Sequence, residues 1–304
     1  MKSLGSGFVP ISAVVFLVSS VGCGPQRAEP DAAQADLWEP KPDTGIVRVA
    51  SFNIQDFGPE KMAEEGVADA LVEIFHQFDI VAVQEVSDRT EEVLGTLEAR
   101  LDQEGNWWSH VASPRLGTTN QKEQYAFFYD TRLVSLVEEG QVYPDPAYET
   151  FERPPFAARF RAGEFDFVLV TVHTRPGAAA KEINALADVG AWAWDEAFPE
   201  EEDIIILGDF NADCTYFNPK TELTSLHVDT WRWVIGDDAD TTVKSTNCAY
   251  DRLVFLAVPT EDDYAGAAGV LRFDDVLDLG GTAPAAVSDH YPVWAEFRTD
   301  RDAP

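Results

Sequence analysis

The 304-residue sequence has few basic residues: 22 lysines and arginines stand against 54 aspartates and glutamates, which gives a formal net charge of −32. A charge of this size repels nucleic acids and anionic lipids over about a Debye length, ~8–10 Å at physiological salt. This excludes a protein that coats nucleic acid with a basic surface. Any polyanionic substrate would therefore need a locally positive or metal-bearing site. An acidic surface is typical of a protein adapted to a saline medium, and it also fits a substrate other than nucleic acid.

Cysteine is scarce as well, with three residues in the chain. Cys214 and Cys248 have no nearby Cys or His partner at the spacing of zinc ligands, which argues against a thiolate zinc site. If Cys23 belongs to an N-terminal processing segment, these two form an even pair, and in an oxidising compartment such a pair is most simply a disulfide. Two free buried thiols are the alternative.

The N-terminal apolar stretch, residues 8–21, is shorter than the ~20 residues that a membrane-spanning helix needs. Lys2 precedes this stretch and Cys23 follows it, a pattern that predicts a signal peptide. The junction at residues 20–23 resembles a bacterial lipoprotein cleavage site. We therefore expect residues 1–23 to be a lipoprotein-type signal with Cys23 as the lipid anchor; ordinary secretion is the alternative.

Composition divides the remainder of the chain. Residues 24–44 are rich in Pro, Ala and Asp and lack apolar periodicity, which predicts a disordered tether. With 45% hydrophobic residues and 12% aromatics in the whole chain, residues 45–298 can build a large core and are expected to form one catalytic domain. Residues 299–304 are expected to be a short tail.

Seven apolar, β-branched segments recur along this domain, and several are continuous rather than alternating, which indicates strands covered on both faces. Amphipathic helical stretches are expected over residues 62–78, 90–101 and 178–198. The mix predicts an α+β fold in which two sheets pack on each other with helices outside. The expected strands are IVRVASFN, DIVAVQEV, YAFFYD, FDFVLVTVH, DIIILGDFN, DRLVFLAV and YPVWAEF.

Polar side chains stand where these strand-like segments begin or end. Each one alone could be an ordinary turn former. Together, residues that come from distant points of the sequence to the ends of strands are how a rigid scaffold builds a single site. They are Asn53, Glu85, His173, Asp209, Asn211, Asp251, Asp289 and His290.

This set of residue types suits the hydrolysis of a phosphodiester, which needs an activated water, a protonated leaving oxygen and neutralised phosphoryl charge. Oxygen ligands without thiolates suit a hard cation such as Mg²⁺, Mn²⁺ or Ca²⁺. His173 and His290 could divide the proton transfers, and Glu123 and Asp251 are available to orient the two imidazoles. The other three histidines are expected to be surface or packing residues.

Six segments occur in the order found in the endonuclease/exonuclease/phosphatase superfamily, and the chain resembles its deoxyribonuclease I family most. The segments are FNIQDFG, DIVAVQEV, TVHTRP, ILGDFNADC, STNCAYDR and SDHYP. The resemblance covers about residues 47–297, and DADTTVKSTNCAYDR is its most specific part. It implies the family fold, a four-layer α/β sandwich of two packed, mostly antiparallel β-sheets flanked by helices.

The resemblance also implies roles in metal binding. Glu85 would hold the catalytic divalent cation, Mg²⁺ or Mn²⁺, with Asn53 and Asp289 nearby. Asp209 and Asn211 would bind metal or phosphate.

The resemblance assigns the proton transfers as well. His290, oriented by Asp251, would act as general base on water. His173, oriented by Glu123, would act as general acid toward the leaving oxygen, although the two roles could be exchanged. Asp209 belongs to the same catalytic set.

Further residues match positions of the family outside the catalytic centre. Arg153, Asn211 and Tyr216 match residues that contact substrate phosphates. Asp240, Thr242 and Thr246 resemble part of a structural calcium site. The Cys214–Cys248 pair matches the structural disulfide of the family.

Two positions depart from the family pattern. Ser87 and Gln121 stand where an arginine and a tyrosine of deoxyribonuclease I enter the DNA minor groove. Each such contact contributes on the order of 1–3 kcal/mol, so binding to duplex DNA is expected to be weaker.

The sequence therefore predicts an exported, lipid-anchored or secreted monomer that cleaves DNA as a Mg²⁺- and Ca²⁺-dependent endonuclease with little sequence preference and leaves 5′-phosphates. One alternative is a phospholipid or sugar-phosphate phosphodiesterase of the same superfamily. The other is a non-catalytic binding protein on this fold.

Overall fold

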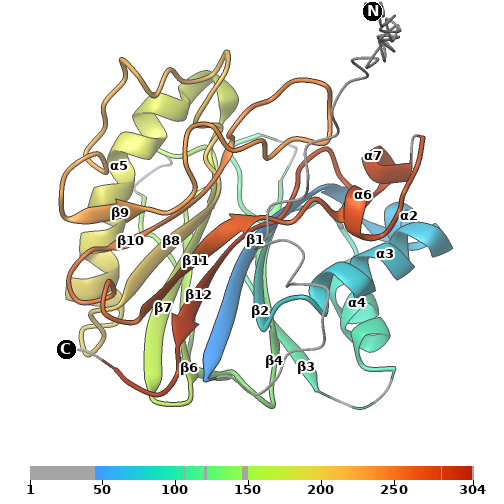
Figure 1. Cartoon of the computed structure of the whole chain (residues 1–304), viewed down its shortest axis with the longest axis horizontal. Coiled ribbons are helices and arrows are strands. Elements are labelled where there is room, and N and C mark those ends of the chain that lie inside the picture. The colour runs from blue at the N-terminus through green and yellow to red at the C-terminus, as the bar shows by residue number, and fades with distance from the viewer. Residues whose placement is uncertain are drawn as a thin grey trace, which may run out of the picture. The chain divides into compact units, whose positions relative to one another are not determined.

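The computed structural model describes residues 45–302, apart from residues 104, 106, 120–121, 146–149 and 282. This part of the chain forms two six-stranded β-sheets that pack face to face and carry helices on their outer faces (Figure 1). The predicted four-layer sandwich is therefore confirmed. The expected signal segment, Cys23, the tether and Gln121 lie outside the described residues.

The first sheet has the strand order β11-β12-β1-β2-β4-β3. Of its neighbouring pairs, only β1 and β2 run parallel. The strands are β1 (Ile46–Phe57), β2 (Ile80–Val86), β3 (Trp108–Ala112), β4 (Gln124–Asp130), β11 (Tyr264–Val270) and β12 (Val293–Arg298).

The second sheet has the order β5-β6-β7-β8-β10-β9 and likewise contains one parallel pair, β7 and β8. Every residue of β7, β8 and β10 is buried, which explains why these segments are apolar without alternation. The strands are β5 (Ser135–Val142), β6 (Phe156–Ala162), β7 (Phe165–His173), β8 (Ile204–Asp209), β9 (Trp231–Trp233) and β10 (Asp251–Leu256).

The helices are shorter than the sequence predicts. The stretch expected over residues 62–78 contains the end of α2 (Pro59–Met62) and all of α3 (Glu65–Phe75), because Glu64 between them has extended backbone. The helix expected from residue 90 is α4 (Val93–Leu101), which begins three residues later than predicted. It begins there because the Asp88 carboxylate accepts the N–H groups of Glu92 and Val93 at the helix start.

The third expected helix is α5 (Ala179–Trp192), which continues through a π-helical turn at Ala193–Ala197. A 3₁₀ turn, Pro176–Ala178, precedes it, and α6 (Phe273–Val276) and α7 (Ala283–Val287) are short. Among the described residues, none of the helices is long and apolar enough to cross a membrane.

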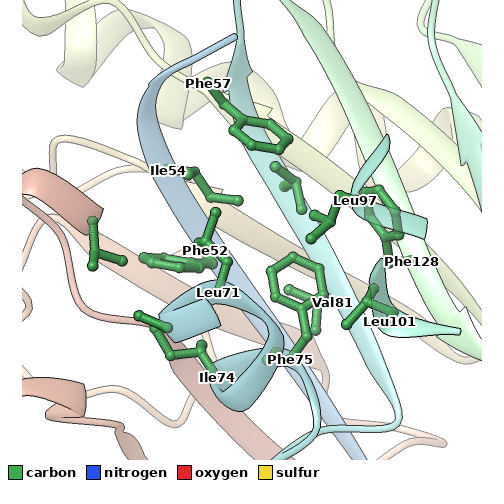
Figure 2. Packing of buried hydrophobic residues seen from close by; sticks show 14 of the residues in the cluster. Phe52, Ile54, Phe57, Leu71, Ile74, Phe75, Val81, Leu97, Leu101 and Phe128 are labelled. Carbon is green, nitrogen blue, oxygen red and sulfur yellow. The ribbon is translucent and has the colours of Figure 1, made fainter. Parts of the chain in front are cut away.

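Three apolar layers hold the sandwich together. The middle layer lies between the sheets and is rich in phenylalanine, with Phe127, Phe160 and Phe297 fully buried. Helices α3 and α4 pack on the outer face of the first sheet; Figure 2 shows Leu71 and Phe75 beside Phe52 and Val81 of β1 and β2. Helix α5 covers the outer face of the second sheet. Burial of this apolar area is the main stabilising contribution to the fold.

The predicted disulfide is present. Cys214 and Cys248 are bonded, with their Cα atoms 5.8 Å apart. The bond joins the loop that follows β8 to the residues that precede β10, so it closes a 34-residue separation beside the ends of two central strands. In the chain-entropy model such a loop stabilises the fold by about 3–4 kcal/mol.

Candidate functional site

The polar residues singled out in the sequence meet at one end of the sandwich. Strands β7 and β8 end there, and β10, antiparallel to β8, begins there, so His173 and Asp251 each pair in register with Asp209. A cavity of about 230 Å³ opens at this end. Its lining residues are Glu85, His173, Pro176, Asp209, Asn211, Tyr216, Thr242, Lys244, Thr246, Tyr250, Asp289 and His290.

Asp209 is the centre of the site. Its Oδ2 lies 3.1 Å from Asn53 Nδ2, 3.5 Å from His173 Nε2 and 3.7 Å from His290 Nε2. Its Oδ1 accepts the backbone N–H of Asn211 at 2.9 Å. The carboxylate is 2% exposed, so these contacts act in a medium of low polarity where charge interactions are strong.

A glycine allows this close approach. A β-carbon at Gly208 would lie 1.9 Å from the Val172 carbonyl oxygen, and Gly208 has φ +151°. Only glycine fits between β7 and β8 at this point, which explains the glycine directly before Asp209.

Each histidine forms a hydrogen bond with its own carboxylate. His173 Nδ1 lies 3.0 Å from Glu123 Oε2, and His290 Nδ1 lies 2.8 Å from Asp251 Oδ2. With Nδ1–H donated to a carboxylate, Nε2 is the nitrogen that faces Asp209 and the cavity in both rings. The structure therefore brings together both predicted pairs.

Arg153 lies behind the first pair and does not line the cavity. Its Nη1 donates to Glu123 Oε1 at 2.9 Å, and its Nη2 donates to the His173 carbonyl at 3.1 Å. The sequence predicted a phosphate contact for Arg153, whereas this arrangement favours a positioning role, because the half-buried Glu123 carboxylate needs a cation beside it. Asn211 and Tyr216, the other two predicted phosphate contacts, do line the cavity.

Oxygen donors that suit a hard cation surround Glu85. Glu85 Oε1 accepts Asn53 Nδ2 at 2.9 Å and lies 3.9 Å from His173 Nε2. One donor atom each from Glu85, His173 and Asp209 fall within 4.8 Å of one another. Glu85 and Asn211 have φ of +61° and +48°, a costly conformation for residues other than glycine that is concentrated at functional sites. Carboxylate and amide oxygens of this kind fit Mg²⁺ or Mn²⁺.

Asp289, the remaining predicted ligand, lines the same cavity and forms an ion pair that the sequence did not predict. Its Oδ2 lies 2.6 Å from Lys244 Nζ, and its Oδ1 lies 3.9 Å from His290 Nε2. The Lys244 side chain is 64% exposed and stands at the cavity wall, so it is a cation within reach of an anionic substrate.

The electrostatic balance favours protonated imidazoles. Burial lowers the pKa of His290, but the carboxylates of Asp251, Asp209 and Asp289 outweigh it and raise this pKa to about 10. For His173, burial and Arg153 lower the pKa, while Glu123 and Asp209 raise it further, so the net shift is upward. Without an additional positive charge nearby, the His290 ring stays charged at neutral pH.

Other residues hold the site in place through hydrogen bonds that sequence patterns do not reveal. The Tyr125 hydroxyl accepts the backbone N–H of His173 at 2.9 Å. The Ser288 hydroxyl donates to the Asn53 carbonyl at 2.6 Å and accepts the His290 N–H at 3.1 Å. Tyr125 lies in an apolar strand and Ser288 in a turn, so only the neighbouring catalytic residues could have drawn attention to them.

The predicted structural calcium residues also come together. Asp240 Oδ1 accepts both the N–H and the hydroxyl of Thr242, at 3.2 and 3.0 Å, and that hydroxyl also reaches the Thr246 carbonyl. Arg272 Nη1 lies 3.5 Å from Asp240 Oδ2 and so competes with a cation for one oxygen. Thr242 pairs with His290 through an isolated β-bridge, which couples this loop to the active residues.

A second cavity of about 310 Å³ shares Glu85 with the first. Three cations, Arg89, Arg115 and Lys122, line it together with three carboxylates, Asp56, Glu85 and Glu123. The Arg115 guanidinium donates to the carbonyls of Asp88 and Lys122 and thereby braces the two loops that carry Arg89 and Lys122. Among the described residues, Arg89 and Lys122 form no ion pair.

The raised pKa of His290 predicts a pH dependence of stability. In EDTA, the favourable interactions of the charged ring are fully present below its unfolded pKa, about 6.5, and are lost as pH rises through its folded pKa, about 10. The difference in free energy of unfolding between wild type and His290→Ala should therefore shrink from pH 6.5 to pH 10, measured by urea denaturation. A difference that grows with pH would contradict this account of the site.

Comparisons with known proteins agree with this geometry. The model of the endonuclease/exonuclease/phosphatase family matches residues 50–290. Deoxyribonuclease-1 of Gallus gallus is 38% identical over 267 residues, which cover 81% of this chain and 90% of that protein. Deoxyribonuclease gamma of Mus musculus is 34% identical over 277 residues, with 85% and 87% covered.

Solved structures share the fold at low sequence identity. D. rerio TDP2 complexed with a single-strand DNA product has a TM-score of 0.60 at 15% identity, over 84% of this chain and 99% of that one. An endonuclease/exonuclease/phosphatase from Bacteroides vulgatus has a TM-score of 0.57 at 16% identity, over 83% and 98%. The chain therefore belongs to the endonuclease/exonuclease/phosphatase family and is close to deoxyribonuclease I within it.

Proposed function

We propose that the protein is a divalent-metal-dependent endonuclease that cleaves DNA with little sequence preference and leaves 5′-phosphates. The observation that carries this proposal is the convergence of two imidazoles, each paired with its own carboxylate, on the carboxylate of Asp209. Similarity to deoxyribonuclease-1 and deoxyribonuclease gamma supports DNA as the substrate.

The two Nε2 atoms divide the proton transfers. His290 Nε2 takes the proton of the attacking water, and Asp251 stabilises the imidazolium that forms. His173 Nε2 protonates the leaving oxygen, with Glu123 and Arg153 holding the ring in place. The two roles can be exchanged without any change in the geometry that supports them.

A divalent cation, Mg²⁺ or Mn²⁺, would be held by Glu85 with Asn53, Asp209, Asn211 and Asp289 around it, where it would neutralise phosphoryl charge and lower the pKa of the nearby imidazoles. Deprotonation of one imidazole is what general-base catalysis requires. A Ca²⁺ ion at Asp240, Thr242 and Thr246 would stabilise the loop that pairs with His290.

Two cations at the second cavity explain how an acidic protein could hold DNA. Arg89 and Lys122 are exposed cations beside Glu85, so a backbone phosphate next to the cleaved one can reach them. They stand close in sequence to Ser87 and Gln121, the positions at which the two minor-groove contacts are missing. We propose that phosphate contacts made by Arg89 and Lys122 replace the minor-groove contacts that are missing at Ser87 and Gln121.

This contact predicts a change in salt dependence. Replacing both cations, Arg89→Gln with Lys122→Gln, should lower DNA affinity and reduce the slope of log affinity against log salt by roughly 1.8, because each duplex phosphate contact contributes about 0.9. Fluorescence anisotropy with labelled duplex in Ca²⁺ measures it. Arg232→Gln, an exposed arginine on β9, is the matched control and should leave the slope unchanged. An unaltered slope in the double variant would rule out the contact.

Substrate class is tested by direct comparison. Purified protein in Mg²⁺ and Ca²⁺ is given supercoiled plasmid, sphingomyelin vesicles and an inositol phosphate in parallel. We expect the plasmid to be nicked, with new 5′ ends that polynucleotide kinase labels only after phosphatase treatment. If the lipid or the sugar phosphate is hydrolysed and the plasmid stays intact, the nuclease assignment is wrong.

We also propose that the protein is exported and anchored through a lipid on Cys23. The Cys214–Cys248 disulfide supports an oxidising compartment. Labelled palmitate should be incorporated into wild type and not into Cys23→Ala, and incorporation into neither would favour ordinary secretion.

A further inference from the structure

A group of carboxylates lies at the end of the sandwich opposite the catalytic site. Asp203 directly precedes β8, whereas Asp209 ends it, so this six-residue strand separates the two sites by roughly 20 Å. Asp263 precedes β11, and Asp302 follows β12 at the C-terminal end of the described chain. One oxygen from each of the three side chains falls within 4.8 Å of the others.

Two of these carboxylates are buried, and Asp203 has no cation beside it among the described residues. Asp203 is 3% exposed and Asp263 is fully buried. Arg159 and Arg161 pair with Asp166, whose Oδ2 lies 2.6 Å from Arg159 Nη2 and 3.0 Å from Arg161 Nη2. Within the described residues, Asp203 and Asp302 form no salt bridge with any cation. Buried charge in this state is costly unless a cation or protons neutralise it.

An unsatisfied oxygen points to a ligand. Oδ1 of Asp203 is buried and accepts no hydrogen bond from the described residues, and the buried Thr260 hydroxyl also makes none. Burial, together with the neighbouring carboxylates, raises the pKa of Asp203 to about 8, although the Thr260 hydroxyl lies close enough to lower it. Buried polar atoms without partners are rare in native proteins and frequently mark an ion or water site.

We propose that Asp203, Asp263 and Asp302 bind a Ca²⁺ ion that ties the C-terminal segment to the starts of β8 and β11. The donors are all oxygens, which suits a hard cation. They come from three separate segments, one of them exposed, and Ca²⁺ accepts such irregular arrangements of six to eight oxygens more readily than Mg²⁺ does. The site is independent of catalysis, because none of its residues contacts the catalytic cavity.

The test is thermal unfolding of the full chain at matched ionic strength, in EDTA and in CaCl₂. At a Ca²⁺ concentration about a hundredfold above Kd, the site should raise Tm by roughly 5–10 °C. Asp203→Asn should lose most of that increase while its Tm in EDTA is equal to or above that of wild type, since one buried charge has been removed. Isothermal titration calorimetry with CaCl₂ should show one site fewer in this variant.

Matched variants separate this site from the others. Asp240→Asn removes a ligand of the predicted calcium loop and Glu85→Gln a ligand of the catalytic site; both should keep the Ca²⁺ increment that Asp203→Asn loses. Asp302→Asn should also reduce the Ca²⁺-dependent increase in Tm. Because Asp302 is exposed, this variant replaces Asp203→Asn in the test if Asp203→Asn does not fold. The proposal is overturned if wild type shows no Ca²⁺-dependent increase in Tm. It is also overturned if Asp203→Asn and Asp302→Asn retain that increase, or if Asp203→Asn lowers Tm equally with and without Ca²⁺.

Discussion

Replacing His290 by alanine is expected to lower kcat for DNA cleavage by about 10²–10⁴-fold, the usual contribution of a general acid or base. The reason is geometric: His290 Nε2 is one of two imidazole nitrogens that face Asp209 at the floor of the cavity. His173→Ala should have an effect in the same range. KM should change far less than kcat in both variants.

A variant with both histidines replaced tests whether His173 and His290 act in the same catalytic step or contribute independently. If the two histidines act in one step, His173→Ala with His290→Ala should be little worse than either single variant. His76→Ala is the control, because His76 is exposed at the end of α3 and outside the cavity, and it should retain full activity. Retention of more than about a tenth of kcat in either single variant would contradict the assignment of that histidine.

Asp209→Asn is expected to be as damaging, for a different reason. The substitution keeps the shape of the side chain but removes the negative charge that both Nε2 atoms and Asn53 Nδ2 face. We expect kcat to fall by about 10³-fold, since one preorganised charged group is lost from a buried site.

The same substitution has a second signature that a merely structural role would not produce. Asp209 is one of the groups that raise the pKa of both histidines. NMR titration of the imidazoles in EDTA should therefore show both pKa values lowered in Asp209→Asn. Unchanged imidazole pKa values together with unchanged kcat would remove Asp209 from the centre of the site.

The sequence allowed most of the site to be predicted because its members stand at the ends of continuous apolar strands. Asn53 and Glu85 lie near the carboxyl ends of β1 and β2, and His173 and Asp209 end β7 and β8. Parallel pairing of β1 with β2 and of β7 with β8 brings these ends to one edge. This pattern does not predict the residues that hold the catalytic side chains in place through a hydroxyl or a guanidinium, such as Tyr125, Ser288 and Arg153. The positioning role of Arg153 is the instructive case, because its partners are far apart in the sequence: Glu123 precedes β4 and His173 ends β7.

The sequence did not predict β3, β5, β6, β9 or β11, and three of these strands have physical reasons for their weak patterns. Strand β5 alternates between exposed and half-buried residues and carries two glutamates, which fits an edge strand. Strand β11, YAGAAGV, is built from small residues beside Trp294 and so lacks the β-branched composition of the central strands. Strand β9 has only three residues. Tertiary pairing, rather than local preference, forms these elements.

Asp88 shows the same limit for helices. Its carboxylate accepts N–H groups from Thr90, Glu92 and Val93, which delays the start of α4 by three residues. The same turn places Arg89 in the lining of the second cavity. A local capping interaction that the sequence analysis did not identify therefore shapes the surface proposed to bind DNA.

The central claim is that the histidine and carboxylate pairs around Asp209 hydrolyse DNA with the help of a divalent cation. Nicking of supercoiled plasmid by the purified protein, with wild type and His290→Ala assayed side by side in Mg²⁺ plus Ca²⁺ and in EDTA, tests it most directly. The account predicts relaxed and then linear plasmid with wild type in metal, and intact plasmid in EDTA and with His290→Ala. Equal nicking by the two proteins, or nicking by wild type that persists in EDTA, would contradict it.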